Sequence, residues 1–149
     1  MKKLMGLSLI LLLLLVGCGS AGETAVSSPN AVLTISSGES QKTYTVAELQ
    51  ALPQAEATFN GVAYTGVALT VLLENSGMAV DDLKAVKAIA ADGFSANYEL
   101  TQIQKADVIV AHAQTDGPLT AEDGTFRMVM PAEEGKANVR QLVEIQAVP

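Results

Sequence analysis

Few side chains in this sequence have the reactivity to do chemistry at a site. The chain has one cysteine, Cys18, one histidine, His112, and two arginines, Arg127 and Arg140. A zinc site of the common kind needs several cysteine or histidine ligands, and a catalytic triad needs a histidine beside its nucleophile. The sequence lacks the parts for such sites, and it also lacks the glycine-rich phosphate loops of nucleotide-binding proteins.

The cysteine lies at the end of an N-terminal apolar segment. Residues 4–16 carry no charge and follow Lys2 and Lys3. This segment is shorter than the roughly 20 apolar residues that a membrane-spanning helix needs, and its length is typical of a signal-peptide core. It ends in Leu15-Val16-Gly17-Cys18, which resembles the lipobox of bacterial lipoprotein signals. In such signals the cysteine thiol receives a diacylglycerol and the peptide is cut just before it.

The lipobox predicts three parts of the chain. Residues 1–17 form a signal peptide, residues 18–30 form a flexible tether because they are small, polar and aperiodic, and residues 31–149 form one folded domain. Lipidated Cys18 would hold the protein on a membrane of the cell envelope, and Gly19 in place of an aspartate favours the outer membrane in a Gram-negative host. The alternative is an uncleaved or secreted protein in which Cys18 is incidental.

The charge of the chain limits its partners. The formal net charge is −7, and removal of Lys2 and Lys3 with the signal peptide would leave −9. Such an acidic chain is repelled by nucleic acids and by anionic lipid surfaces. We therefore expect no nucleic-acid partner, and the lipid at Cys18 must supply the membrane attachment by itself.

Short strands outnumber helices along the expected domain. Apolar and β-branched runs predict strands over 31–36, 41–46, 55–59, 62–64, 85–90, 95–100, 107–113, 126–130 and 139–148. Helices are predicted over 46–52, with Thr45 as the cap and Glu48 at the third helical position, from Gly66 to the Asn75-Ser76-Gly77 stop, and over 101–105. Turns are predicted at Asn60-Gly61, over 116–118 and over 122–124. Because these elements do not alternate regularly, the fold class is α+β and not a doubly wound sheet.

The motifs of the domain, read in order, resemble one known family. They are Tyr64-x-Gly66-Val67-x-Leu69-x-x-Leu72-Leu73, Asp92-Gly93-Phe94, Ala111-x-x-x-x-Asp116-Gly117-Pro118-Leu119, Gly124-x-x-Arg127-x-Val129-x-Pro131 and Gly135-x-x-x-Val139-Arg140-x-Leu142-x-x-Ile145. Their order and spacing are similar to the molybdopterin-binding domain of the sulfite oxidase family, in a compact single-domain form. The resemblance covers residues 31–149 and implies a mixed-sheet α+β fold with short helices.

The resemblance also implies a cofactor and a set of residues that bind it. This chain has only some of these residues. The family domain holds a molybdenum-pterin cofactor and binds the metal through a cysteine, which would fall within 53–60, where this sequence has none. Oxygen ligands from threonine or asparagine replace a soft thiolate poorly. Of the basic residues that hold the pterin phosphate, Arg127 falls on one such position and Arg140 on a nearby one, whereas Ala137 stands where a lysine is common.

Each candidate residue also has a structural interpretation. Arg127 could bind an anion in a bidentate manner, but a strand arginine paired with a carboxylate is the interpretation that we favour. His112 could titrate or ligate, but a packed, hydrogen-bonded histidine fits an apolar strand better. Asp92 and Asp116 could act as acid or base groups, but each precedes a glycine, which favours a turn-capping role.

These observations predict an envelope lipoprotein whose domain has lost the metal ligand and kept the pocket. Such a domain would bind a small anion, a pterin-like molecule or a partner protein without catalysis, with Arg127, Arg140 and His112 as candidate binding residues. The alternative is a membrane-tethered molybdopterin-dependent oxidoreductase that acts on a small oxyanion or a sulfoxide. A third possibility is a structural domain that presents an apolar surface for assembly.

Overall fold

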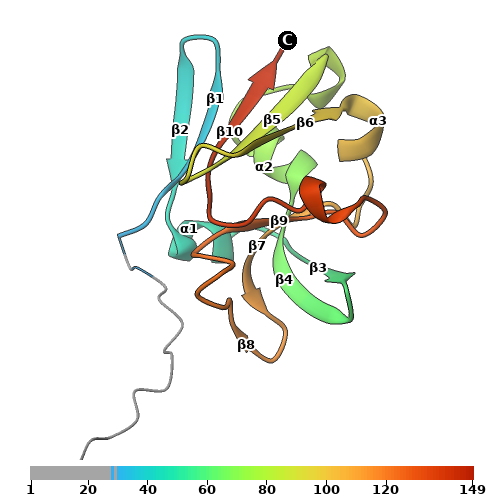
Figure 1. Cartoon of the computed structure of the whole chain (residues 1–149). Helices are drawn as coiled ribbons and strands as arrows, with labels where there is room; N and C mark the ends of the chain where they lie inside the picture. The colour runs from blue at the N-terminus through green and yellow to red at the C-terminus, as the bar shows by residue number, and fades with distance from the viewer. Residues whose placement is uncertain (1–27, 29) are drawn as a thin grey trace, which may run out of the picture.

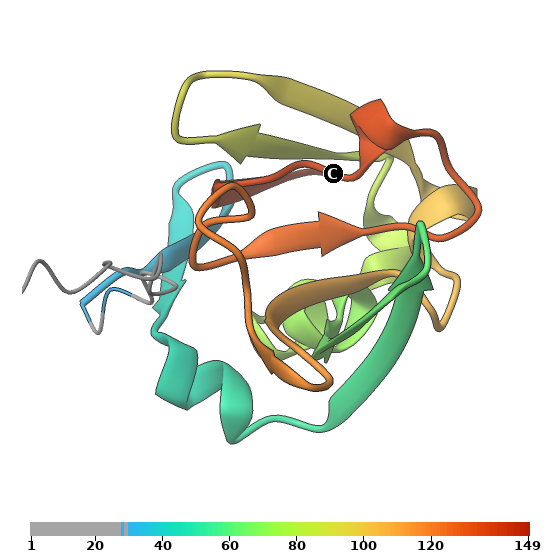
Figure 2. The same cartoon turned by 60° about the horizontal axis from the view of Figure 1, so that its bottom comes forward.

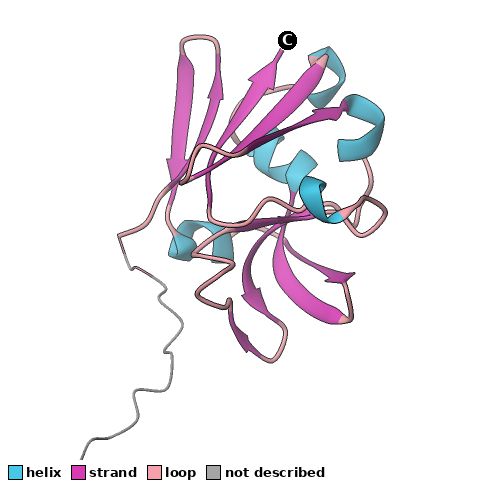
Figure 3. Cartoon of the chain, viewed as in Figure 1, coloured by secondary structure: helices cyan, strands magenta, loops and turns pink. Residues whose placement is uncertain are grey.

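The domain consists of two β-sheets with short helices packed against them (Figures 1 and 3). A computed structural model describes Ser28 and residues 30–149. The expected signal peptide, the lipidation site Cys18 and nearly all of the expected tether lie outside these residues. Within them, no helix is both long enough and apolar enough to cross a bilayer.

The first sheet has the order β2-β1-β10-β5-β6, and the second has the order β3-β4-β7-β8, with β9 also paired to β7. The strands are β1 (Leu33–Ser37), β2 (Ser40–Tyr44), β3 (Gln54–Phe59), β4 (Val62–Ala68), β5 (Ala85–Ala90), β6 (Ser95–Glu99), β7 (Ile109–Gln114), β8 (Gly117–Pro118), β9 (Arg127–Val129) and β10 (Leu142–Val148). The helices are α1 (Val46–Gln50), α2 (Leu69–Asn75) and α3 (Leu100–Ile103), with 3₁₀ turns η1 (Val80–Asp82) and η2 (Gly135–Ala137). Because β1 pairs with β10 in parallel and the other pairs are antiparallel, the mixed-sheet α+β fold expected from the sequence is confirmed.

Helix α1 begins as its capping residues predict. The Thr45 side chain accepts the Glu48 backbone N–H, and the Glu48 carboxylate accepts the Thr45 backbone N–H at 2.7 Å. These two reciprocal bonds satisfy donors that the first turn of a helix otherwise leaves unpaired. The pair also lowers the pKa of the Glu48 carboxyl, mainly through the backbone bond at Thr45.

The start of α2 differs from the sequence-based expectation. Gly66 does not open the helix but lies inside β4, and the helix begins at Leu69. A Cβ atom on Gly66 would collide with the carbonyl oxygen of Val110 on the neighbouring strand β7. The apolar run after Gly66 fits a helix by its spacing, but the glycine is there because two strands pass very close to each other.

Two further segments differ from the sequence-based expectation: the start of the last strand and the turn over 116–118. The last strand was expected over 139–148, but β10 begins at Leu142, after Gln141 adopts a positive φ of 48°. In the segment expected as a turn over 116–118, Gly117 and Pro118 form the short strand β8 against β7. Neither change moves an element to the other sheet.

The main core lies between the two sheets and encloses α2. Figure 2 shows β9 running between the first sheet and the rest of the second. Buried apolar residues from β1, α2, β5, β7, β9 and β10 meet there: Leu33, Ile35, Leu69, Leu72, Leu73, Val86, Ala88, Val110, Met128 and Ile145. A smaller cluster on the other face of the second sheet contains Ala57, Tyr64, Ile109, Ala111, Leu119 and Val129. β9 contributes to both clusters and thus positions Arg127, its first residue.

Candidate functional site

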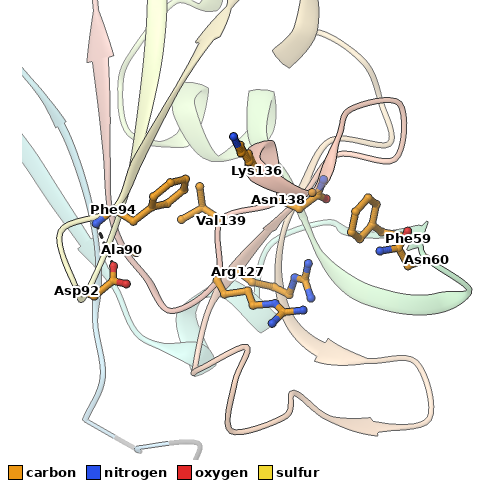
Figure 4. Close-up of a pocket in the computed structure, with 11 residues that line it drawn as sticks. Phe59, Asn60, Ala90, Asp92, Phe94, Arg127, Lys136, Asn138 and Val139 are labelled. Atoms are coloured by element: carbon orange, nitrogen blue, oxygen red, sulfur yellow. Dashed lines mark hydrogen bonds between the residues drawn. The ribbon is translucent and has the colours of Figure 1, made fainter.

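A pocket of about 360 Å³ opens beside β9. It is bordered by the β3–β4 turn, the β5–β6 turn, the start of β9 and the segment around η2 (Figure 4). Both arginines of the chain and two of its three phenylalanines line it. We call it the arginine pocket, and its lining residues are Phe59, Asn60, Ala90, Asp92, Phe94, Arg127, Gly135, Lys136, Asn138, Val139 and Arg140.

Arg127 is the deepest cation of the pocket, with only 2% of its surface exposed. Its Nη1 donates to Asp123 Oδ1 at 2.6 Å and to the Tyr64 hydroxyl at 2.8 Å, and its Nε donates to the Met128 carbonyl at 3.4 Å. Nη2 makes no hydrogen bond within the described part of the chain and is not enclosed. The guanidinium is therefore fixed through Nη1 and Nε, and Nη2 is free to donate to a ligand.

Two aromatic rings support the Arg127 guanidinium. Its central carbon lies 4.5 Å from the centre of the Tyr64 ring and 6.0 Å from that of Phe59. Burial raises the pKa of the Tyr64 phenol, although the nearby Arg127 charge opposes this shift. The phenol is thus neutral at physiological pH, and its oxygen accepts the arginine hydrogen bond.

Asp123 connects the two arginines of the pocket. The turn that holds it is closed by Thr120, whose hydroxyl donates to Asp123 Oδ2 at 2.9 Å. Asp123 Oδ1, which pairs with Arg127, also lies 3.6 Å from Arg140 Nε. Arg140 is more exposed and pairs through Nη1 with Glu122 at 3.0 Å. The pocket therefore has one buried cation, Arg127, held by several bonds, and one exposed cation, Arg140, held by surface ion pairs.

Lys136 is the third cation of the pocket and is held there by a buried asparagine. The Asn138 side chain accepts the Met130 N–H at 2.7 Å and donates to the carbonyls of Met130 and Glu134. These bonds close the loop that carries η2. Lys136 is exposed and forms no ion pair within the described residues. The family resemblance implies a lysine at the position of Ala137, and Lys136 lies one residue before it.

Two turns form the aromatic walls of the pocket. Asn60, with a φ of 50°, leads the β3–β4 turn directly after Phe59. At the β5–β6 turn, Asp92 Oδ1 accepts the Phe94 N–H at 2.9 Å, which confirms the turn-capping role expected for Asp92. Phe94 is 46% exposed at the mouth of the pocket. The rings are thus held by tight turns at opposite ends of the lining (Figure 4).

His112 does not line this pocket, so the structure brings together two of the three candidate residues and leaves the third elsewhere. It is buried on β7, where its Nε2 lies 2.8 Å from Gln54 Oε1. Gln54 Nε2 already donates to the carbonyls of Leu49 and Leu52, so Oε1 is an acceptor and His112 Nε2 carries the proton. Within the described residues Nδ1 is buried without a hydrogen-bond partner, and burial lowers the pKa of the imidazole.

The side chains of the pocket fit the organic part of a molybdenum-pterin cofactor better than its metal. Arg127, Lys136 and Arg140 offer donors for an anion, and the aromatic walls suit a ring. The chain has no cysteine between Ala31 and Pro149, and the described residues hold no group of three histidine, cysteine, aspartate or glutamate side chains that could bind a metal. The donors at the β3–β4 turn are hard oxygen atoms, which do not replace a thiolate.

Sequence reasoning missed several residues of the site. Asp123 was expected only as a turn residue, and Lys136 was not considered. A spacing of four residues brings side chains together on a helix, but Asp123 lies in a turn before a strand, so its spacing from Arg127 gave no signal. For Lys136, Phe59 and Phe94 the sequence gives no such signal, because three separate loops bring them together.

Comparisons with known proteins give a family and a fold. The family described as Oxidoreductase molybdopterin binding domain matches residues 35–149. No curated protein sequence matches the chain. Among solved structures, the crystal structure of the sulfane dehydrogenase SoxCD from Paracoccus pantotrophus is similar, with a TM-score of 0.70 and 21% identity. The similarity covers 85% of this chain and 40% of that chain, so this chain spans well under half of its length.

Proposed function

The chain belongs to the oxidoreductase molybdopterin binding domain family, and on that premise we propose that it is a binding module for a small organic anion of the pterin type. The ligand occupies the arginine pocket without a metal–protein bond. One observation carries this proposal: three cationic side chains line a pocket whose described lining includes no thiolate.

The pocket is organised for binding before any ligand arrives. Arg127 is fixed by Asp123, Tyr64 and the Met128 carbonyl, so little side-chain entropy is lost when a ligand contacts its free Nη2. Lys136 and Arg140 lie at the more exposed side and can adjust to the ligand. A volume of about 360 Å³ is within the range of small-molecule sites.

We also propose that the protein is lipid-anchored in the cell envelope through Cys18. The support is the lipobox at residues 15–18 and the uncharged segment before it. Two or three acyl chains hold a protein stably on a bilayer, whereas one holds it weakly. A Cys18→Ser variant of the full chain should leave the membrane fraction and lose the acyl mass. Membrane attachment unchanged in this variant would contradict the anchor.

Ligand binding can be tested with 6-carboxypterin, a fluorescent pterin with one carboxylate. We expect saturable fluorescence quenching by the wild-type protein, and affinity reduced about tenfold or more in Arg140→Gln and Lys136→Gln, because each removes a charged hydrogen-bond donor. Lys87→Gln on β5 is the matched control and should bind as the wild type does. Lack of binding by the folded wild-type protein would contradict the proposal.

The second candidate is a molybdopterin-dependent oxidoreductase that acts on a small oxyanion or a sulfoxide. The family match and the fold favour it more directly than they favour a binding module. The donor atoms of the pocket argue against this candidate, because residues 31–149 contain no cysteine to bind the metal. This candidate requires a visible absorption band in the purified protein and turnover of sulfite or dimethyl sulfoxide with an artificial electron carrier. A colourless protein without turnover would remove it.

A further inference from the structure

We infer that the arginine pocket selects aromatic ligands with a single negative charge, and that Asp123 and Glu122 set this limit. The inference rests on the proposed function and names the class of anion that the same site takes. Its basis is the balance of charges around the two arginines.

The cations of the pocket are already largely matched by carboxylates. Asp123 pairs with Arg127 at 2.6 Å, and Glu122 pairs with Arg140 at 3.0 Å. Asp92 also lines the pocket and adds a third carboxylate. The pocket and the residues directly behind it therefore hold three positive and three negative side chains, although only the two arginines are ion-paired.

A ligand cannot easily displace the buried carboxylate. Asp123 is only 3% exposed and is held by Thr120 as well as by Arg127. A ligand anion must therefore bind beside the Arg127–Asp123 pair and not in place of Asp123. One negative charge can use the free Arg127 Nη2 and the exposed Lys136. A second negative charge would lie near Asp123, where the neighbouring cation Arg140 is already paired with Glu122, and such a charge is unfavourable in a partly buried site.

The walls of the pocket add a requirement for a ring. Phe59 and Phe94 stand at opposite ends of the lining, with Ala90 and Val139 as further apolar surface. A small inorganic oxyanion would contact the cations and leave this apolar surface in water. A planar ring that covers it adds hydrophobic and stacking contacts.

A matched pair of probes tests the charge limit. 2-Naphthalenesulfonate and 2-naphthyl phosphate share a ring, but at about pH 8 the sulfonate carries one negative charge and the phosphate nearly two. We expect calorimetry to show about tenfold tighter binding of the sulfonate to the wild-type protein. Methanesulfonate, which has no ring, should bind about tenfold more weakly than the naphthalene compound.

Variants of the carboxylates show whether they set the limit. Glu122→Gln and Asp123→Asn should each shift the affinity ratio toward the phosphate by about fivefold or more. Glu74→Gln on α2 is the control and should leave the ratio unchanged. Glu122 is 80% exposed on its side chain, so its variant will fold even if the Asp123 variant does not.

Three results would overturn the inference. They are equal or tighter binding of the phosphate to the wild-type protein, no shift of the ratio in Glu122→Gln, or no binding of either naphthalene probe. If 6-carboxypterin still binds in any of these cases, the proposed function stands and only the charge limit fails. Loss of 6-carboxypterin binding would remove the proposed function itself.

Discussion

Arg127 Nη1 lies 2.6 Å from Asp123 Oδ1, and both side chains are almost completely buried. The pair holds Arg127 in the lining of the arginine pocket, where its Nη2 is still free to donate. A buried pair of this kind is weak evidence for stability in itself, because both charges lose their hydration. Its effect here is to hold the guanidinium in one place and to cancel most of its charge.

Removal of one partner of this pair should be costly. Asp123→Ala leaves the Arg127 charge buried without its match, and we expect the free energy of unfolding to fall by about 3–5 kcal/mol. Urea denaturation followed by circular dichroism measures this. The double variant Asp123→Ala/Arg127→Met should be less destabilised than the sum of the two single variants, since no charge then remains unpaired. Simple additivity would show that the two residues are not coupled.

Gly66 tests the close approach of β4 and β7. In Gly66→Ala the new methyl group meets the Val110 carbonyl, so the strands must separate, and we expect a loss of about 1–3 kcal/mol or more in unfolding free energy. Gly117→Ala is the control, because nothing lies near a Cβ atom at that position. Its stability should stay within about 0.5 kcal/mol of the wild type. Equal tolerance of both alanines would contradict the close packing.

His112 should make the stability of the domain depend on pH. Burial lowers its pKa in the folded state, so the unfolded chain takes up a proton first as the pH falls below about 6.5. Stability is therefore present above this pH and is lost on acidification, by at most about 1.4 kcal/mol per pH unit. Urea denaturation between about pH 7.5 and 5.5 should show this decline in the wild type and much less of it in His112→Gln. The same slope in both proteins would rule out His112 as the cause.

Asn138 should be important for both the loop and the ligand. In Asn138→Ala the buried Met130 N–H loses its acceptor, which costs about 1–3 kcal/mol of unfolding free energy. Because the same loop carries Lys136, 6-carboxypterin should also bind more weakly. Asn97→Ala on the exposed side of β6 is the control and should change neither quantity. Unchanged affinity for 6-carboxypterin in Asn138→Ala would contradict a role of this loop in ligand binding.

Local signals in the sequence predicted much of the fold. The capping residues Thr45 and Glu48 predicted the start of α1, and Asn60-Gly61 predicted the β3–β4 turn. Apolar runs predicted β5 and β7. The error at Gly66 has a long-range cause, because the residue that requires a glycine, Val110, is on another strand. Local periodicity carries no information about such a contact.

The site was predictable only in part for the same reason. Arg127 and Arg140 were identified from their positions in the motifs, and both line one pocket. His112 was considered because it is a rare and reactive residue, but its environment depends on the partner that β3 brings to it, Gln54. The pairing of Arg127 with Asp123 depends on a turn that buries both. Which cation is neutralised is thus decided by tertiary structure and not by composition.

The molybdenum content of the protein, purified from a host that makes the molybdenum-pterin cofactor, is the most direct test that no metal is held by the arginine pocket. We expect far less than one atom of molybdenum per chain by elemental analysis, and the same low value in Arg127→Met. One tightly held atom of molybdenum or tungsten per chain in the wild type, lost in Arg127→Met, would contradict a metal-free binding module and favour the oxidoreductase.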